Sequence, residues 1–234
     1  MKYSRIMFAG PSGIGKTTLA KFISYTLEGA PEFISGSMSN LMPDTKSTPH
    51  QDILGEDSKY LYNLDYQLLN LRNKLFQDKP EFVSDRSYLD LAAYFVYKQD
   101  KSIPQCEIEH FISICKLLLN EHCDCLIFLN LNPRWANEWT IEDNSKRICN
   151  VYFQSHMSAI MNMVLDMMGY KYMRSVINYR SLRDNMPKIL RGLVEMDYGF
   201  EEGVISSTRG KTNVFIINEP NRKIREDILQ LILT

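Results

Sequence analysis

The stretch "RIMFAGPSGIGKTT" (residues 5–18) decides which fold this chain can form. It opens with a short apolar run, 5–10, that is typical of a buried strand, and residues 15 to about 27 carry apolar side chains at helical spacing. Between the two lie three glycines within six positions, followed directly by a lysine and two threonines. The pattern predicts a strand, a glycine-rich loop and a helix, in that order.

The loop satisfies the pattern G-x-x-x-x-G-K-[ST] in the context that the pattern requires. Glycines let successive N–H groups curl around a phosphate, and the helix N-terminus adds about half a positive charge. A lysine then reaches the β and γ phosphates, and a threonine hydroxyl reaches Mg²⁺. A plain glycine turn would need neither side chain, so we predict that ATP and Mg²⁺ bind here. The predicted nucleotide-binding residues are Gly10, Ser12, Gly13, Ile14, Gly15, Lys16, Thr17 and Thr18.

Short apolar runs alternate with longer amphipathic ones along the rest of the chain. Further strands are predicted at 31–36, 81–86, 125–133 and 212–220, and further helices at 60–76, 88–98, 107–122, 146–168, 180–196 and 221–233. This order predicts an α/β fold in three layers, with a parallel sheet of about five strands and right-handed crossovers. We expect one domain over 1–234, with an acceptor insertion at about 37–58 and a lid and helical region at about 133–196.

A second group of polar residues follows the strand predicted at 81–86. Asp85 and Arg86 stand at its carboxyl end, the edge of a parallel sheet where ligands bind. A carboxylate there can hold Mg²⁺, and an arginine can fork onto a phosphate. The alternative is that Asp85 or Ser87 caps the following helix and Arg86 is solvated.

With the two groups together, the sequence resembles the thymidylate-kinase-like branch of the P-loop nucleoside and nucleotide kinases. "GPSGIGKTT" and "VSDRSYLDLAAY" carry the resemblance, which is close over about 5–30 and 80–97 and loose to about 170. It implies a P-loop kinase fold in which extra helices form a lid and acceptor lobe. It also implies that Asp85 assists Mg²⁺ and that Arg86 holds the acceptor.

The sequence departs from that family at two places. Ser12 and Ile14 occupy loop positions where thymidylate kinases carry an acidic or basic side chain, which argues against strict dTMP specificity. The position of the lid is filled by "RWANEWTIEDNSKR" (134–147), and Arg147 is our candidate for contacting the transferred phosphate. Arg180 and Arg183 compete for that role, and Arg147 pairing with a neighbouring acidic residue is the plain alternative.

Three hypotheses of function follow. The leading one is an ATP-dependent kinase of a nucleoside or nucleotide, with Lys16, Asp85, Arg86 and Arg147 as catalytic residues and Thr17 and Asp85 as metal ligands. The second, which the resemblance implies, is a phage-type DNA kinase acting on 5-hydroxymethyluracil bases. The mixed basic and aromatic stretch at 170–191 suits contacts with a phosphate backbone and with bases, and an ordinary charged helical surface explains it equally well. The third is a nucleotide-binding switch, against which stands the absence of an N-K-x-D motif.

Composition limits the partners. With 27 basic and 28 acidic side chains, the chain has no overall field that would hold a polyanion. The five cysteines have no metal-ligand spacing, so we expect reduced packing thiols, and no apolar stretch is long enough for a membrane span. We expect a cytoplasmic protein without a membrane partner, for which a homodimer is compatible with the sequence.

Overall fold

The computed structural model describes residues 4–26, 31–42, 57–98, 103–130, 151–170, 205–206 and 213–218. Its sheet has the strand order β2-β3-β1-β4-β6-β5. The strands are β1 (Arg5–Ala9), β2 (Glu32–Ile34), β3 (Phe82–Ser84), β4 (Cys125–Asn130), β5 (Ile205–Ser206) and β6 (Asn213–Asn218). All neighbouring pairs are parallel except β5 with β6. The predicted parallel α/β sheet is therefore confirmed. The sheet has one strand more than the five predicted, because β5, with two residues, is too short to show a hydrophobic pattern in the sequence.

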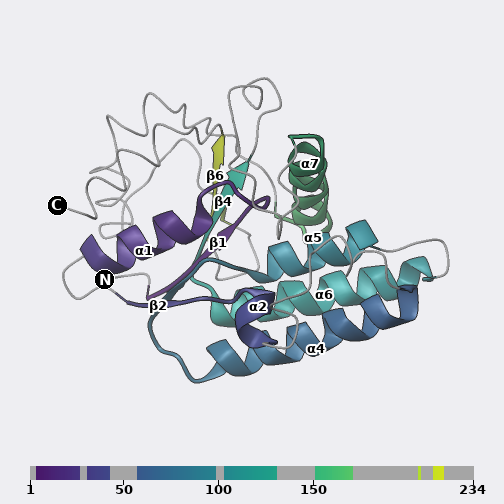
Figure 1. Ribbon diagram of the computed structural model, residues 1–234, viewed down its shortest axis with the longest axis horizontal. Helices are drawn as coiled ribbons and strands as arrows, with labels where there is room; N and C mark the ends of the chain where they lie inside the picture. The colour runs from purple at the N-terminus through teal and green to yellow at the C-terminus, as the bar shows by residue number, and fades with distance from the viewer. Residues whose placement is uncertain are drawn as a thin grey trace.

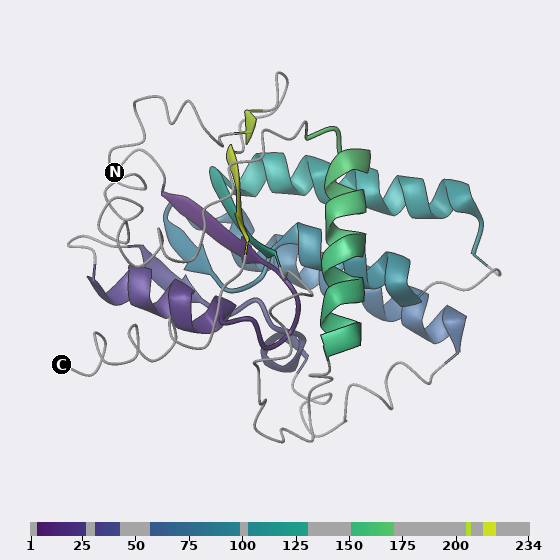
Figure 2. The ribbon, with the colours of Figure 1, turned by 90° about the horizontal axis from the view of Figure 1, so that it is seen from above.

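The helices cover both faces of this sheet (Figure 1). They are α1 (Lys16–Thr26), α2 (Met38–Leu41), α4 (Ser58–Gln77), α5 (Tyr88–Lys98), α6 (Gln105–His122) and α7 (Val151–Met167). Figures 1 and 2 show α1 on one side of the sheet and α4, α5 and α6 together on the other, with α7 lying against α5. The predicted helices at 180–196 and 221–233 fall outside the described residues.

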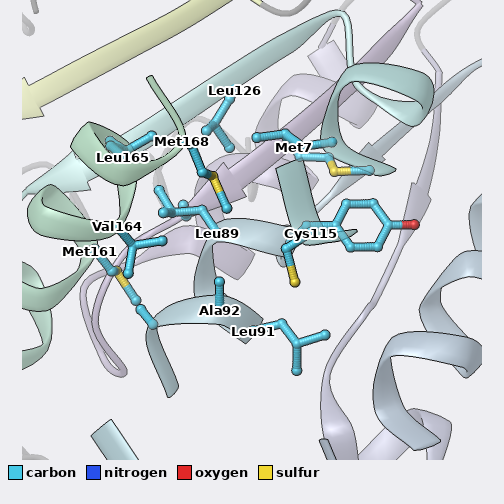
Figure 3. Packing of buried hydrophobic residues seen from close by; sticks show 14 of the residues in the cluster. Met7, Leu89, Leu91, Ala92, Cys115, Leu126, Met161, Val164, Leu165 and Met168 are labelled. Atoms are coloured by element: carbon cyan, nitrogen blue, oxygen red, sulfur yellow. The ribbon is translucent and has the colours of Figure 1, made fainter. Parts of the chain in front are cut away.

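The main core lies between one face of the sheet and the helices on that side. Because side chains alternate along a strand, Met7 of β1 and Leu126 of β4 point into this core, while their chain neighbours point to the opposite face of the sheet. Figure 3 shows side chains from the sheet meeting those of α5, α6 and α7 there. Two methionines of α7, Met157 and Met161, are fully buried, as expected for adaptable core residues, whereas Met163 and Met167 are exposed.

No helix is predicted between the strand at 31–36 and the helix at 60–76, and this is wrong for the first part of the stretch that joins β2 to α4. Residues 38–41 form the single helical turn α2, which packs on α4. Met38 and Leu41 contact the core, so tertiary burial stabilises a turn that has no sequence signal of its own. Residues 43–56, the remainder of the predicted acceptor insertion, fall outside the described residues.

The cysteines agree with the expectation of reduced packing thiols where the structure describes them. Cys115, Cys123 and Cys125 are buried, and burial raises the pKa of each thiol. Cys106 is exposed and also free, and Cys149 falls outside the described residues. In the described segments, none of the helices combines the length and the apolar character that crossing a bilayer requires.

Candidate functional site

The glycine-rich loop joins β1 to α1 and depends on its glycines. Gly10, Gly13 and Gly15 adopt φ values of +145°, +81° and +103°, which side-chain-bearing residues rarely reach. A Cβ on Gly10 would lie 2.6 Å from the carbonyl oxygen of Leu129, the backbone of the neighbouring strand β4. The first glycine is therefore required both by its conformation and by the close approach of β4.

Lys16 begins α1 and turns back over the loop. Only 5% of this residue is exposed, and its Nζ donates to the carbonyl oxygens of Gly10 and Pro11, the latter at 2.8 Å. The same Nζ lies 3.8 Å from Asp90 Oδ1. An ammonium group is thus fixed at the N-terminus of a helix, where the backbone already favours an anion.

Asp85 meets the phosphate loop at the residue that follows Lys16. Thr17 Oγ1 donates to Asp85 Oδ2 at 2.7 Å. The contact follows from the topology, because β3 runs parallel to β1 and Asp85 comes just after the carboxyl end of β3. Asp85 Oδ1 also accepts from the backbone N–H of Gly36 at 3.2 Å and from Ser35 Oγ at 3.3 Å.

The oxygen atoms of Thr17 and Asp85 are the donor type that Mg²⁺ prefers. Within the described residues there is no group of three or more His, Cys, Asp or Glu side chains that could hold a metal. Of the residues that the structure describes, Asp85 would offer a cation here one carboxylate and Thr17 one hydroxyl, and a nucleotide would add its phosphate oxygens. That sparse protein ligation fits Mg²⁺, which keeps most of its water or phosphate ligands.

Arg86 and Asp90 form the other side of this site. Arg86 Nη1 lies 3.6 Å from Asp90 Oδ1, the same carboxylate oxygen that faces Lys16. Burial opposes the charge on Arg86, but the neighbouring acidic groups, Asp90 first, outweigh it and raise the pKa of the guanidinium. Two cations therefore share one buried carboxylate at the edge of the loop.

The alternative interpretation, a simple helix cap, is correct for Ser87 only. Ser87 precedes α5, and its Oγ accepts from the backbone N–H of Leu89 at 3.2 Å. Asp90 Oδ2 accepts in return from Ser87 N at 3.0 Å and from Ser87 Oγ at 2.9 Å, which completes a capping box. Asp85 does not cap the helix, and its side chain is directed at Thr17.

Sequence reasoning missed Asp90 and Arg72. The motif "SYLD" (87–90) is a recognisable capping box, but the sequence does not show that Asp90 also accepts from Gly10 N at 3.4 Å. Arg72 comes from the middle of α4 and is 4% exposed. Its guanidinium donates to Gly36 O at 3.1 Å and to Ser87 O at 2.7 Å. Arg72 thus ties together the two segments that flank Asp85 and Arg86.

The remaining predicted residues differ in what the structure shows. Ser12 and Ile14 are 4% and 3% exposed, so their side chains are packed and the loop presents mainly backbone groups. Thr18 lies half-buried in the first turn of α1. Arg147, Arg180 and Arg183 fall outside the described residues, so the structure does not choose among them.

A strand, a glycine loop, a helix that begins with a buried lysine, and a carboxylate just after the neighbouring parallel strand together define a P-loop nucleotide-binding protein. The particular family follows from comparison with known proteins. The chain belongs to the family described as "AAA domain", whose model matches residues 5–176. A comparison with curated proteins found no match.

Proposed function

We propose that the protein is an ATP-dependent kinase that transfers the γ-phosphate to a nucleoside or a nucleotide. The observation that carries this proposal is the pair of contacts made by the segment after β3: Asp85 with Thr17 at 2.7 Å, and Arg86 with the carboxylate that also faces Lys16. Membership of the AAA domain family supports the nucleotide-binding half of the proposal.

The nucleotide half rests on the loop. The N–H groups of residues 12–18, which include the first turn of α1, would bind the triphosphate, with Lys16 neutralising charge on its β and γ groups. Thr17 and Asp85 would hold Mg²⁺, which supplies charge neutralisation for the phosphates. Asp85 is itself fixed by Gly36 and Ser35, so its carboxylate is oriented before any ligand arrives.

The acceptor half rests on Arg86. In the transfer, an acceptor oxygen forms a bond to the γ-phosphorus as the bond to the β–γ bridging oxygen breaks, and ADP leaves with that electron pair. A hydroxyl acceptor also gives up its proton to solvent, whereas the dianionic phosphate of a nucleotide has none to lose. A guanidinium beside the phosphate-binding lysine suits the holding of an anionic acceptor in line with the γ-phosphate.

The position of the predicted acceptor insertion agrees with this role for Arg86. The insertion starts at about residue 37, and the residue before it, Gly36, is packed against Arg86. A Cβ on Gly36 would lie 3.1 Å from Arg86 Cβ. The chain therefore enters the insertion beside Arg86.

The test is transfer of label from γ-³²P-ATP to a panel of nucleosides, nucleoside monophosphates and DNA containing hydroxymethylated bases. We expect labelled nucleotide with the wild-type protein, and for Arg86→Ala a fall in acceptor kcat/KM of about a hundredfold with ATP binding nearly unchanged. Arg86 would lose its assigned role if both substrates were affected equally.

Asp85→Asn serves as the control for the metal site. It keeps the shape of the side chain and removes its charge, so it should impair ATP turnover with every acceptor alike. Label that appears only in DNA would favour the DNA-kinase alternative, and label released only to water would favour a switch or hydrolase. Either result would overturn the proposed nucleoside or nucleotide kinase.

A further inference from the structure

One side of α7 carries a row of polar side chains, while its buried apolar side chains pack into the core. Gln154, Ser158 and Asn162 recur every four residues and therefore lie on the same side of the helix. Ser158 Oγ donates to Asn130 Oδ1 at 2.5 Å, and Asn162 Nδ2 donates to the same oxygen at 3.1 Å. Asn130 is the last residue of β4, the neighbour of β1. The two bonds turn the row toward the carboxyl end of β4, and Figure 2 shows the helix α7 running past this end of the sheet.

Gln154 contacts the phosphate loop directly. Its Nε2 donates to the carbonyl oxygen of Ser12 at 2.7 Å, across 142 positions of sequence. Gln154 is 3% exposed and Ser12 is 4% exposed, so water competes little for either group. A buried carbonyl that lost this donor would be left without a partner, which makes the contact costly to break.

This bond fixes the orientation of the peptide between Ser12 and Gly13. The carbonyl and the N–H of a trans peptide point in opposite directions, so a Ser12 oxygen held toward α7 turns the Gly13 N–H away from α7. Gly13 has φ of +81°, and glycine adopts positive and negative φ at similar cost. The backbone of the loop therefore tolerates either orientation of this peptide, and the choice falls to a contact from outside the loop.

The neighbouring carbonyls of the loop are held in a related way. Lys16 Nζ takes the carbonyl oxygens of Gly10 and Pro11, and Gln154 takes that of Ser12. Three consecutive carbonyls are thus each bound by a side-chain donor. Fixing carbonyls in this way leaves the N–H groups of the loop for an anion, as a phosphate-binding nest requires.

We propose that Gln154 is a positioning residue of the nucleotide site. It holds the Ser12 carbonyl toward α7, so that the Gly13 N–H stays directed at a bound phosphate. The inference rests on the nucleotide binding of the proposed function and is independent of the acceptor. It extends the site to α7, a helix that follows the strand β4 and contributes no residue to the motifs of the sequence.

Gln154→Met tests the proposal, since methionine keeps the length of the side chain and lacks the donor. We expect the Kd for MgATP, measured by calorimetry, to rise about tenfold. In the nucleotide-free protein, the Gly13 amide signal in ¹⁵N relaxation dispersion should broaden, because the peptide then exchanges between two orientations. Gln154→Glu, which offers only acceptor oxygens to the carbonyl, should weaken binding at least as much.

Asn162→Ala is the matched control, since it removes a polar contact from the same row without touching the loop. It should lower the melting temperature while leaving the Kd within about twofold of wild type and the Gly13 signal sharp. The proposal would be overturned by a folded Gln154→Met protein with unchanged Kd and a sharp Gly13 signal, or by an equal loss of affinity in Asn162→Ala. If the wild type bound no MgATP while Gly13 still broadened in Gln154→Met, the proposed function would fail and the peptide restraint would stand.

Discussion

At the residue scale, the two carboxylate oxygens of Asp90 contact different parts of the site. Oδ2 caps α5 through Ser87, while Oδ1 accepts from Gly10 N and faces the cations of Lys16 and Arg86. One buried carboxylate therefore joins the start of a helix to the start of the phosphate loop. The negative charge of Asp90 also offsets the repulsion between the cations of Lys16 and Arg86, which lie 3.8 Å and 3.6 Å from its Oδ1.

His122 provides a residue-scale prediction about pH. It lies buried at the end of α6, with Nε2 2.8 Å from Asn73 Oδ1, and burial lowers the pKa of its imidazole although Glu121 opposes the shift. Below its ordinary pKa of about 6.5, the unfolded state binds a proton that the folded state resists. The free energy of unfolding should therefore fall as pH is lowered from above that value toward the depressed folded pKa.

The measurement is urea unfolding of wild type and His122→Gln between pH 7.5 and 5.5. Glutamine keeps an N–H donor for Asn73 and does not titrate, so the part of the pH dependence that belongs to His122 should disappear in the variant. His110→Gln, a substitution at a histidine on the exposed side of α6, is the control and should leave the wild-type slope in place. Parallel slopes for wild type and His122→Gln would exclude this histidine as the source.

At the scale of elements, local signals explain what the sequence predicts well. α5 spans Tyr88–Lys98, as predicted, because a capping box starts it and an apolar face sustains it. The single turn α2 has no such signal and depends on burial against α4. The approach of Asp85 to the loop follows once β3 is paired parallel with β1. The contacts of Arg72 depend on how α4 packs, and no local sequence pattern encodes that packing.

Arg72 carries the element-scale prediction. Its guanidinium bridges Gly36 O and Ser87 O, and burial lowers the pKa of this group although the Asp90 carboxylate opposes the shift. Arg72→Met removes the donor that Gly36 O accepts from and leaves Ser87 O with its longer bond from the backbone N–H of Leu91, at 3.5 Å. We therefore expect a loss of about 2–3 kcal/mol in the free energy of unfolding, measured in urea. Turnover should fall as well, because the segments holding Asp85 and Arg86 are no longer tied together.

Lys74→Met provides the comparison for Arg72→Met. It removes a cation from an exposed position two residues further along α4 and should change stability by less than about 0.5 kcal/mol. Arg72→Lys should fall between the two, since an ammonium cannot reproduce the fork of the guanidinium. Equal stability of Arg72→Met and wild type would mean that the bridge contributes nothing net.

At the scale of the whole molecule, the sheet order brings the site together. β1 lies between β3 and β4, so three adjacent carboxyl ends deliver the glycine loop, Asp85 and Asn130 to one edge. These pairings join strands that are far apart in sequence, and alternating apolar runs do not specify them. The sequence therefore predicts the layers, while the strand order and the contact of α7 with the loop require the folded structure.

The last prediction uses the whole molecule as its own reporter of nucleotide binding. A ligand that binds only the folded state at about a hundred times its Kd stabilises it by about 2.7 kcal/mol, which corresponds to a rise in Tm of about 5–10 °C for a chain of this size. We expect MgATP to produce this rise with wild type. ATP without Mg²⁺ should produce less, because the oxygens of Thr17 and Asp85 then have no cation to share with the phosphates.

Lys16→Ala should retain its fold and lose most of this rise, since its ammonium would contribute mainly to the binding of phosphates. Lys21→Ala is the matched control, because it removes the same charge from the exposed side of the same helix, α1, where Nζ lies over the ring of Phe33. A wild-type rise in Lys21→Ala together with its loss in Lys16→Ala places the phosphates at the start of α1. The same rise in Tm in both variants would mean that the phosphates bind elsewhere, and that the glycine loop has another role.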